Sequence, residues 1–310
     1  MSINNDALSS QYNILTLKVV NGFTYSVAGC TFLVAPFYIY AVVVKSSPAM
    51  RRYKYLLLVF TIFSGFVFLT ITLFAPICKN NGYVLHGLLK EVDLYIFTLF
   101  AVGVVDAHIV TMDILLLMLI NLYNRASKNL QLQPRYLVKS FHIFMLITSV
   151  CEIVVFSIWF TYSKMPWGLN VYFYFIEHVA PPVIGLYQLS RIILLVVVIS
   201  LNNRFGRKLK EMKSVRAAEF HKMLARAINT SVVFIVLITR APIAFVYVAS
   251  FLKNVPLTDV VITVATCLQQ TLMLGEMLIT LYYIKPYRMF IVGLFNNEVA
   301  PVLIVSNTFE

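Results

Sequence analysis

Long apolar segments constrain this sequence more than any other feature. An α-helix needs about 20 predominantly apolar residues to cross the hydrocarbon core of a bilayer. The chain is 60% hydrophobic and only 12% charged, which is more apolar surface than a soluble globule can bury. The sequence therefore predicts an all-α fold, a seven-transmembrane helix bundle, with spans near residues 23–44, 56–76, 94–123, 141–162, 182–201, 228–252 and 259–284.

The basic residues predict how these spans are oriented. Most of the 25 Lys and Arg residues lie just after the first, third, fifth and seventh spans, in segments 45–54, 125–139, 204–226 and 285–288. Cytoplasmic loops carry an excess of Lys and Arg, so these segments are expected in the cytoplasm and the N-terminus outside. The net charge of +12 is thus explained by the orientation of the spans in the membrane and by contact of the basic loops with the lipid bilayer. It does not indicate nucleic-acid binding.

The short loops between spans indicate one domain. We expect a single transmembrane domain over residues 1–295 and a short cytoplasmic tail over 296–310, with no cleavable signal peptide. Residues 289–295 are too few to span and predict a short amphipathic helix after the seventh span. Prolines at positions 36 and 242 lie inside spans, where they can kink a helix.

Polar residues within the spans are the most informative positions. A charge at bilayer depth costs about 2.5 to 3.5 kcal/mol, so such side chains should face the bundle interior and find partners. Asp106 and Asp113 are seven residues apart and share one helix face, while His108 points elsewhere. Either acid can pair with Arg191 or Arg240. The remaining members of this intramembrane polar network are Glu152, Gln269, Gln270 and Glu276.

Enzymatic chemistry finds no support in the sequence. Motifs for metal-dependent hydrolysis, nucleophilic serine and phosphate binding are missing, so we expect no enzyme and no cofactor. The four cysteines lack the spacing of a metal site, and Cys78 alone lies near the outer surface. Retinal binding would require a lysine in the seventh span, which has none. A receptor or a transporter remains.

Three short motifs resemble nematode serpentine chemoreceptors of the Str superfamily, especially class h. They are the proline-containing segment 36–40 with the loop 45–50, the Tyr-Asn-Arg sequence at 123–125, and the ending Ile-Lys-Pro-Tyr-Arg at 284–288. The chain departs from the class at Ser47, where threonine is usual, and near Arg125, where the usual preceding acid is missing. Span number, polarity and loop lengths are similar along the whole chain.

The resemblance implies a chemosensory G-protein-coupled receptor. Such a protein binds a small environmental chemical from outside, activates a heterotrimeric G protein inside, and resides in the plasma membrane of sensory-neuron cilia. Within the outer halves of spans three, five, six and seven, the expected ligand-binding residues are Asp106, Tyr187, Gln188, Arg191, Tyr247, Gln269 and Gln270. The inner residues expected to contact the G protein are Arg125, Arg204, Arg207, Lys208 and Arg288.

Two functions stay open at this point. The first is the receptor. The second is a proton-linked small-solute transporter that uses Asp106, Asp113 and Glu276, although an odd number of spans without an internal repeat is unlike most transporters. Homo- and hetero-oligomers are both compatible with the sequence.

Overall fold

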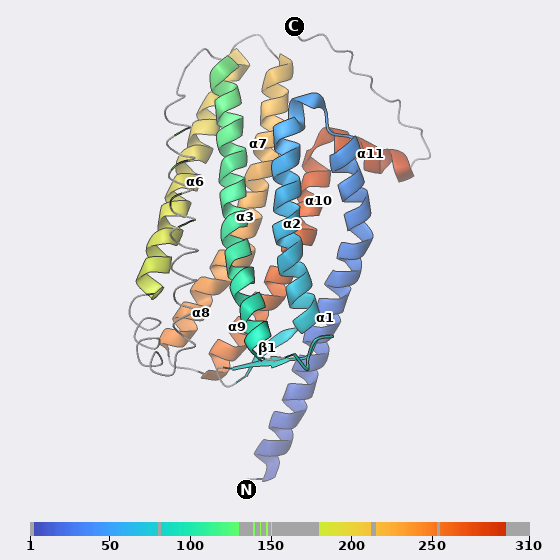
Figure 1. Ribbon diagram of the computed structural model, residues 1–310, viewed down its shortest axis with the longest axis vertical. Helices are drawn as coiled ribbons and strands as arrows, with labels where there is room; N and C mark the ends of the chain where they lie inside the picture. Colours follow the sequence, from blue (N-terminus) through green and yellow to red (C-terminus); the bar gives the residue numbers. More distant parts are fainter. Residues whose placement is uncertain are drawn as a thin grey trace.

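The computed structural model describes residues 3–79, 82–92, 94–129, 180–211, 215–252 and 255–295, with isolated positions at 139, 143, 147 and 150. The expected fourth span, 141–162, lies outside these residues except for three of the isolated positions, and so does the expected tail, 296–310. The long helices run roughly along one axis (Figure 1). The described helices are α1 (Ile3–Val44), the 3₁₀ turn η1 (Pro48–Met50), α2 (Arg51–Phe74), α3 (Leu94–Asn129), α6 (Ala180–Glu211), α7 (Val215–Ile235), the π-helical segment η3 (Val236–Arg240), α8 (Ala241–Phe251), α9 (Val255–Gln270), α10 (Leu272–Tyr283) and α11 (Lys285–Phe295).

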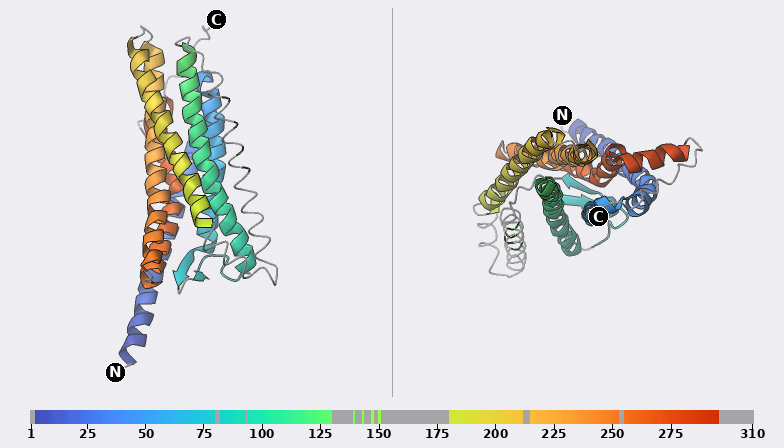
Figure 2. Two further views of the ribbon diagram at one scale, coloured as in Figure 1. Left: turned by 90° about the vertical axis from the view of Figure 1, so that its left-hand side faces the viewer. Right: turned by 90° about the horizontal axis from the view of Figure 1, so that it is seen from above.

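Five segments of the described helices are long and apolar enough to cross a membrane. They are Leu17–Val44, Arg51–Phe74, Leu99–Asn124, Glu219–Arg240 and Val255–Tyr283. Each overlaps one of the predicted spans, so the all-α, membrane-type fold is confirmed at this level. α6, which contains the predicted fifth span, is a further long helix of 32 residues beside α3 and α7 (Figure 2).

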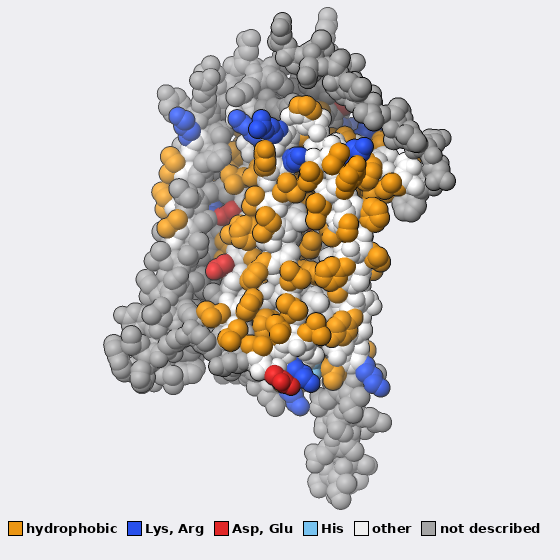
Figure 3. Space-filling model, turned by 45° about the vertical axis from the view of Figure 1, so that its right-hand side comes forward, with side chains coloured by type: hydrophobic (Ala, Val, Ile, Leu, Met, Phe, Trp, Pro, Cys, Tyr) orange, Lys and Arg blue, Asp and Glu red, His pale blue; other side chains and the backbone are white. Residues whose placement is uncertain are grey.

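The surface of the bundle fits a lipid environment. Large apolar side chains such as Phe32, Leu33 and Ile62 are exposed over 60%, 71% and 69% of their surface. Figure 3 shows a broad hydrophobic belt on the surface, with Lys and Arg gathered at its two ends. In water such a patch would be far larger than soluble monomers tolerate. Burial in hydrocarbon explains it.

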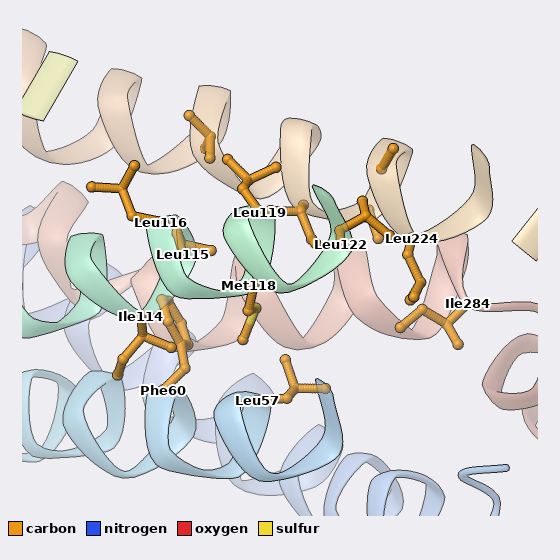
Figure 4. Packing of buried hydrophobic residues seen from close by; sticks show 14 of the residues in the cluster. Leu57, Phe60, Ile114, Leu115, Leu116, Met118, Leu119, Leu122, Leu224 and Ile284 are labelled. Atoms are coloured by element: carbon orange, nitrogen blue, oxygen red, sulfur yellow. The ribbon is translucent and has the colours of Figure 1, made fainter. Parts of the chain in front are cut away.

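α3 forms the centre of the hydrophobic core. Its leucine and methionine side chains pack against two neighbouring helices. Figure 4 shows them between Leu57 and Phe60 of α2 on one side and Leu224 of α7 on the other. Leu115 and Leu119 are fully buried. Since a helix that is apolar on nearly all sides must be surrounded, this pattern explains why α3 lies inside the bundle.

The sixth and seventh predicted spans are both interrupted. In the sixth, α7 passes through η3 into α8, and Pro242 at the start of α8 has no N–H to give to the preceding turn. The π-helical turn accommodates this gap, since the N–H of Ala241 bonds to the carbonyl of Val236, five residues back. In the seventh, Thr271 separates α9 from α10, and its hydroxyl donates to the carbonyl of Leu268 at 2.7 Å.

A small β-hairpin covers one end of the bundle, a feature that the all-α prediction lacked. Strands β1 (Pro76–Lys79) and β2 (Gly82–Leu85) are antiparallel, and Cys78 pairs with Tyr83. The backbone N–H of Cys78 donates to the hydroxyl of Thr263 at 3.2 Å, and the thiol donates to Asp259 at 3.1 Å. Burial and this bond to Asp259 raise the pKa of the Cys78 thiol to about 12.

The turn out of α2 brings the hairpin close to the helix end. Ala75 adopts a left-handed conformation, with φ of 38°, which ends α2. Gly87 then approaches the helix so closely that a Cβ there would lie 2.1 Å from the carbonyl oxygen of Leu73. Only glycine fits this position. The hairpin is therefore fixed against both α2 and α9.

The short helix expected after the seventh span is present and begins earlier than predicted, at Lys285. α11 leaves the bundle sideways (Figure 2) and is anchored by Tyr287, which is fully buried. The Tyr287 and Ser46 hydroxyls are 2.6 Å apart, and the Phe290 ring packs on Tyr40. Nζ of Lys45 lies over the Phe290 ring, 5.5 Å from the ring centre.

Candidate functional site

Among the described residues, Arg191 and Asp113 form a bidentate ion pair inside the bundle. Nε of Arg191 lies 3.0 Å from Oδ1 of Asp113, and Nη2 donates to Oδ2 at 3.2 Å. Arg191 is 1% exposed and the Asp113 side chain 11%. The sequence left open which acid pairs with which arginine, and Asp113 with Arg191 is the pair that the fold brings together. This pair joins α3 to α6 at the middle of the bundle.

A second polar cluster faces the opposite neighbours of α3. Nε2 of the buried His108 lies 3.3 Å from Oε1 of Gln269, which places α3 against α9. Arg240, the last residue of η3, is close enough to act electrostatically on the His108 imidazole. As expected, His108 does not share the face of Asp113. It is nevertheless an interior residue, and it adds a contact to span seven that the sequence did not indicate.

Asp106 also lies on α3, two residues before His108, and therefore points about 200° away from it around the helix. It is partly buried, and its Oδ1 is shielded from solvent with no hydrogen-bond partner in the part of the chain that the structure describes. Asp106 and Asp113 are separated by about 10 Å along the helix axis, because each residue rises about 1.5 Å. Asp106 is therefore outside the ion pair and can accept a bond from another group.

Gln270 faces a different part of the bundle from its neighbour Gln269. Its side chain is completely buried, and its amide donates to the carbonyl of Thr24 at 3.1 Å and to the hydroxyl of Thr72 at 2.9 Å. These bonds tie α9 to α1 and α2. The two glutamines were predicted together as ligand-binding residues, but only Gln269 lies in the cluster with His108.

Glu276 belongs to a third cluster, between α10 and the helices around it. The Thr280 hydroxyl donates to its carboxylate at 3.3 Å, and Ser231 of α7 is a further hydrogen-bond neighbour. Tyr38 lies within electrostatic range, and its hydroxyl is 3.0 Å from that of Thr61. This places Glu276 apart from Asp113. Asp106, Asp113 and Glu276, the acids that a proton-linked transporter would use, therefore do not form one continuous hydrogen-bonded chain among the described residues.

For several of the predicted site residues the structure describes only the backbone, and for one it describes neither backbone nor side chain. Tyr187 and Gln188 lie on α6, Tyr247 on α8 and Arg125 near the end of α3, where side-chain surroundings are outside the description. The same holds for the side chain of Lys208 on α6. Glu152 falls outside the described residues altogether.

The predicted G-protein contacts that can be placed lie at the end opposite the hairpin. Arg204 and Arg207 are exposed on α6, and Arg288 is exposed on α11. This end also contains η1 and the start of α7 (Figure 1). The basic segments after spans one, five and seven therefore share one end of the molecule, as the charge pattern requires.

Two cavities open at this basic end. The first, of about 560 Å³, lies among η1, α7, α10 and α11. The second, of about 410 Å³, lies among η1, α2, α3 and α7, and its polar lining includes Arg51, Arg52, Asn121 and Asn124. Of the predicted ligand residues whose side chains are described, Asp106, Arg191, Gln269 and Gln270, none lines either cavity.

Sequence reasoning missed two buried polar groups. The Asn202 amide donates to the carbonyls of Leu119 and Val198, at 3.0 and 3.1 Å, and His221 lies 3.3 Å from the carbonyl of Asn202. They connect α3, α6 and α7 near the basic end. Asn202 directly follows a predicted apolar span, and a polar residue at that position is the sequence feature that could have indicated a buried contact.

Comparison of the chain with protein-family models, with curated proteins and with solved structures gave no match.

Proposed function

We propose that this protein is a chemosensory G-protein-coupled receptor. The observation that carries the proposal is the polar cluster of His108, Gln269 and Arg240 inside the helix bundle, together with the solvent-shielded carboxylate oxygen of Asp106 on the same helix, α3. Such a cluster offers a small ligand both hydrogen-bond donors and acceptors in an apolar setting, which is what small-molecule sites need.

The cluster is also placed where a ligand can act on the helices. Arg240 ends the π-helical segment η3, and Gln269 lies two residues before the interruption at Thr271. Irregular turns separate rigid helix segments whose relative tilt can change at low cost. A ligand that binds one tilt more tightly than the other shifts the equilibrium between them.

The G protein would bind at the opposite, basic end. The cavity lined by Arg51 and Arg52, with Arg125, Arg204, Arg207, Lys208 and Arg288 around the same end, offers it a positively charged surface in the cytoplasm. The residence in the plasma membrane and in sensory cilia rests on the family resemblance. Oligomers of this chain, with itself or a related receptor, are compatible with the proposal.

The proposal is tested in cells that express the chain with a sensor of G-protein dissociation. A panel of small volatile and water-soluble chemicals should contain at least one that evokes a concentration-dependent signal. Asp106→Asn should then raise the half-maximal concentration at least tenfold, because one charged hydrogen-bond acceptor is lost. Glu91→Gln, which removes an exposed acid from the loop after the hairpin, serves as the control and should leave the response unchanged.

A proton-linked solute transporter is the second candidate. It is favoured by the interrupted seventh span, because transporters often bind substrate at broken helices, and by the buried Glu276. Solute uptake driven by a pH gradient, abolished by Glu276→Gln and occurring without any G-protein signal, would favour this function over the receptor.

A further inference from the structure

The first cavity at the basic end is distinguished by its charge. The residues that line it include four cations, Lys222 and Arg226 on α7 and Lys285 and Arg288 on α11, and one acid, Glu219. This leaves a formal surplus of three positive charges around a space of about 560 Å³. All four cationic side chains are exposed, so their charged groups can reach a ligand in the cleft. We refer to this cavity as the basic cleft.

The geometry of the two helices holds these cations on facing walls. Lys222 and Arg226 are four residues apart on α7, and Lys285 and Arg288 are three apart on α11, so each pair lies on one helix face. The backbone N–H of Lys285 contacts the sulfur of Met223 at 3.3 Å, which fixes the start of α11 against α7. Tyr287, buried and bonded to Ser46, prevents α11 from moving away. The cleft is therefore preformed.

The cleft lies at the level where the apolar helices end. One membrane-length segment begins at Glu219 and another ends at Tyr283, and both residues line the cleft. The lining also includes the apolar residues Met50, Phe220 and Met223. Tyr282 at its rim is 63% exposed, and Met289 on the next turn of α11 is 55% exposed. A ligand here meets cations at its head and apolar surface beside it.

We propose that the basic cleft binds the phosphate-bearing headgroup of an anionic membrane lipid, with the acyl chains along the exposed apolar side of α10 and α11. Phosphate carries several negatively charged oxygens, which suit Arg and Lys from two helices at once. Anionic lipids concentrate in the cytoplasmic leaflet, where the basic end is expected. The proposal concerns lipid binding and does not depend on the receptor function.

The test uses the purified full-length chain in detergent. Dioctanoyl phosphatidylinositol bisphosphate and dioctanoyl phosphatidylserine are added separately, and bound lipid is counted by native mass spectrometry while the melting temperature is followed. Dioctanoyl phosphatidylcholine tests the acyl chains alone, and inorganic phosphate tests the free anion. At least one anionic lipid should bind in a one-to-one ratio and raise the melting temperature, and neither phosphatidylcholine nor phosphate should do so.

Paired variants identify the site. Lys222→Gln with Arg226→Gln, and separately Lys285→Gln with Arg288→Gln, should each weaken lipid binding about 30-fold, as two lost contacts near the membrane surface predict. Arg204→Gln with Arg207→Gln removes two exposed cations of the same end outside the cleft and should leave the affinity unchanged. The exchange Lys222→Arg with Arg226→Lys preserves the charge and should retain binding even if a neutral variant fails to fold.

Three results would overturn the proposal. An equal loss in the Arg204 and Arg207 variant would mean that total surface charge, and not the cleft, attracts the lipid. Binding of inorganic phosphate at the same concentration as the lipid would assign the cleft to a soluble anion. Binding of a soluble polyglutamate peptide without any response to lipid would assign it to an acidic protein segment.

Discussion

At the scale of single residues, the Asp113–Arg191 pair determines the largest predicted change in stability. Asp113→Asn leaves the guanidinium of Arg191, which is 1% exposed, without its charged partner. Removing one member of a buried pair costs about 3 to 5 kcal/mol, whereas replacing both by apolar residues of similar volume is often neutral. The melting temperature of Asp113→Asn in detergent should therefore fall strongly, and Asp113→Leu with Arg191→Met should recover most of the loss.

The double variant also serves as the control for this prediction. If it melts as low as Asp113→Asn, the damage comes from lost packing around α3 and α6 and the ion pair contributes little. Equal melting of Asp113→Asn and the unchanged protein would contradict the burial of Arg191.

The same residues show how far the sequence predicts the site. Depth in the bilayer identified Asp113 and Arg191 as interior charges, because hydrocarbon penalises any other place for them. It did not select between Asp106 and Asp113, since both share a helix face, and the choice depends on how α6 rotates against α3. Gln269 and Gln270 show a related limit: adjacent residues on a helix point about 100° apart, so one contacts His108 and the other Thr24 and Thr72.

At the scale of elements, Gly275 controls how closely α10 packs against α7. A Cβ at this position would lie 2.0 Å from the tip of the Phe234 ring. Gly275→Ala should therefore displace the ring and destabilise the bundle by about 1 to 3 kcal/mol, as overpacking does. Phe234→Leu, which removes the tip of the ring, should restore the melting temperature of Gly275→Ala.

Gly29→Ala is the matched control, because a Cβ at Gly29 meets nothing within 4 Å in a helix of the same kind. A comparable loss of stability in Gly29→Ala would show that helix glycines in general, and not the contact with Phe234, determine the result.

The predictability of the elements follows from their periodicity. Apolar segments long enough to span a membrane give a strong signal, and five of the predicted spans correspond to described membrane-length helices. The hairpin was missed although Asn81-Gly82 is a typical turn dipeptide between β-forming residues, because strands of four residues carry little signal of their own. α11 begins at Lys285, earlier than predicted, and Pro286 lies in its first turn, where proline is well tolerated.

At the scale of the whole molecule, the distribution of charge predicts the orientation in the membrane. The end with η1, Arg204 and α11 should face the cytoplasm, and the hairpin should face the exterior. An epitope tag inserted after residue 212 should bind antibody only in permeabilised cells, and one inserted after residue 80 should bind it in intact cells. Antibody binding at position 212 in intact cells would contradict both the orientation and the proposed coupling to a G protein.

The bond between Cys78 and Asp259 has a consequence for sulfur chemistry at the hairpin end. Oxidation and disulfide exchange need the thiolate, and with a pKa of about 12 the Cys78 sulfur stays protonated at pH 7. An oxidising environment converts accessible, reactive cysteines into cross-links between neighbouring chains. Here burial and the bond to the carboxylate of Asp259 together keep the proton on sulfur, so Cys78 can remain at the hairpin end without joining copies of the protein together.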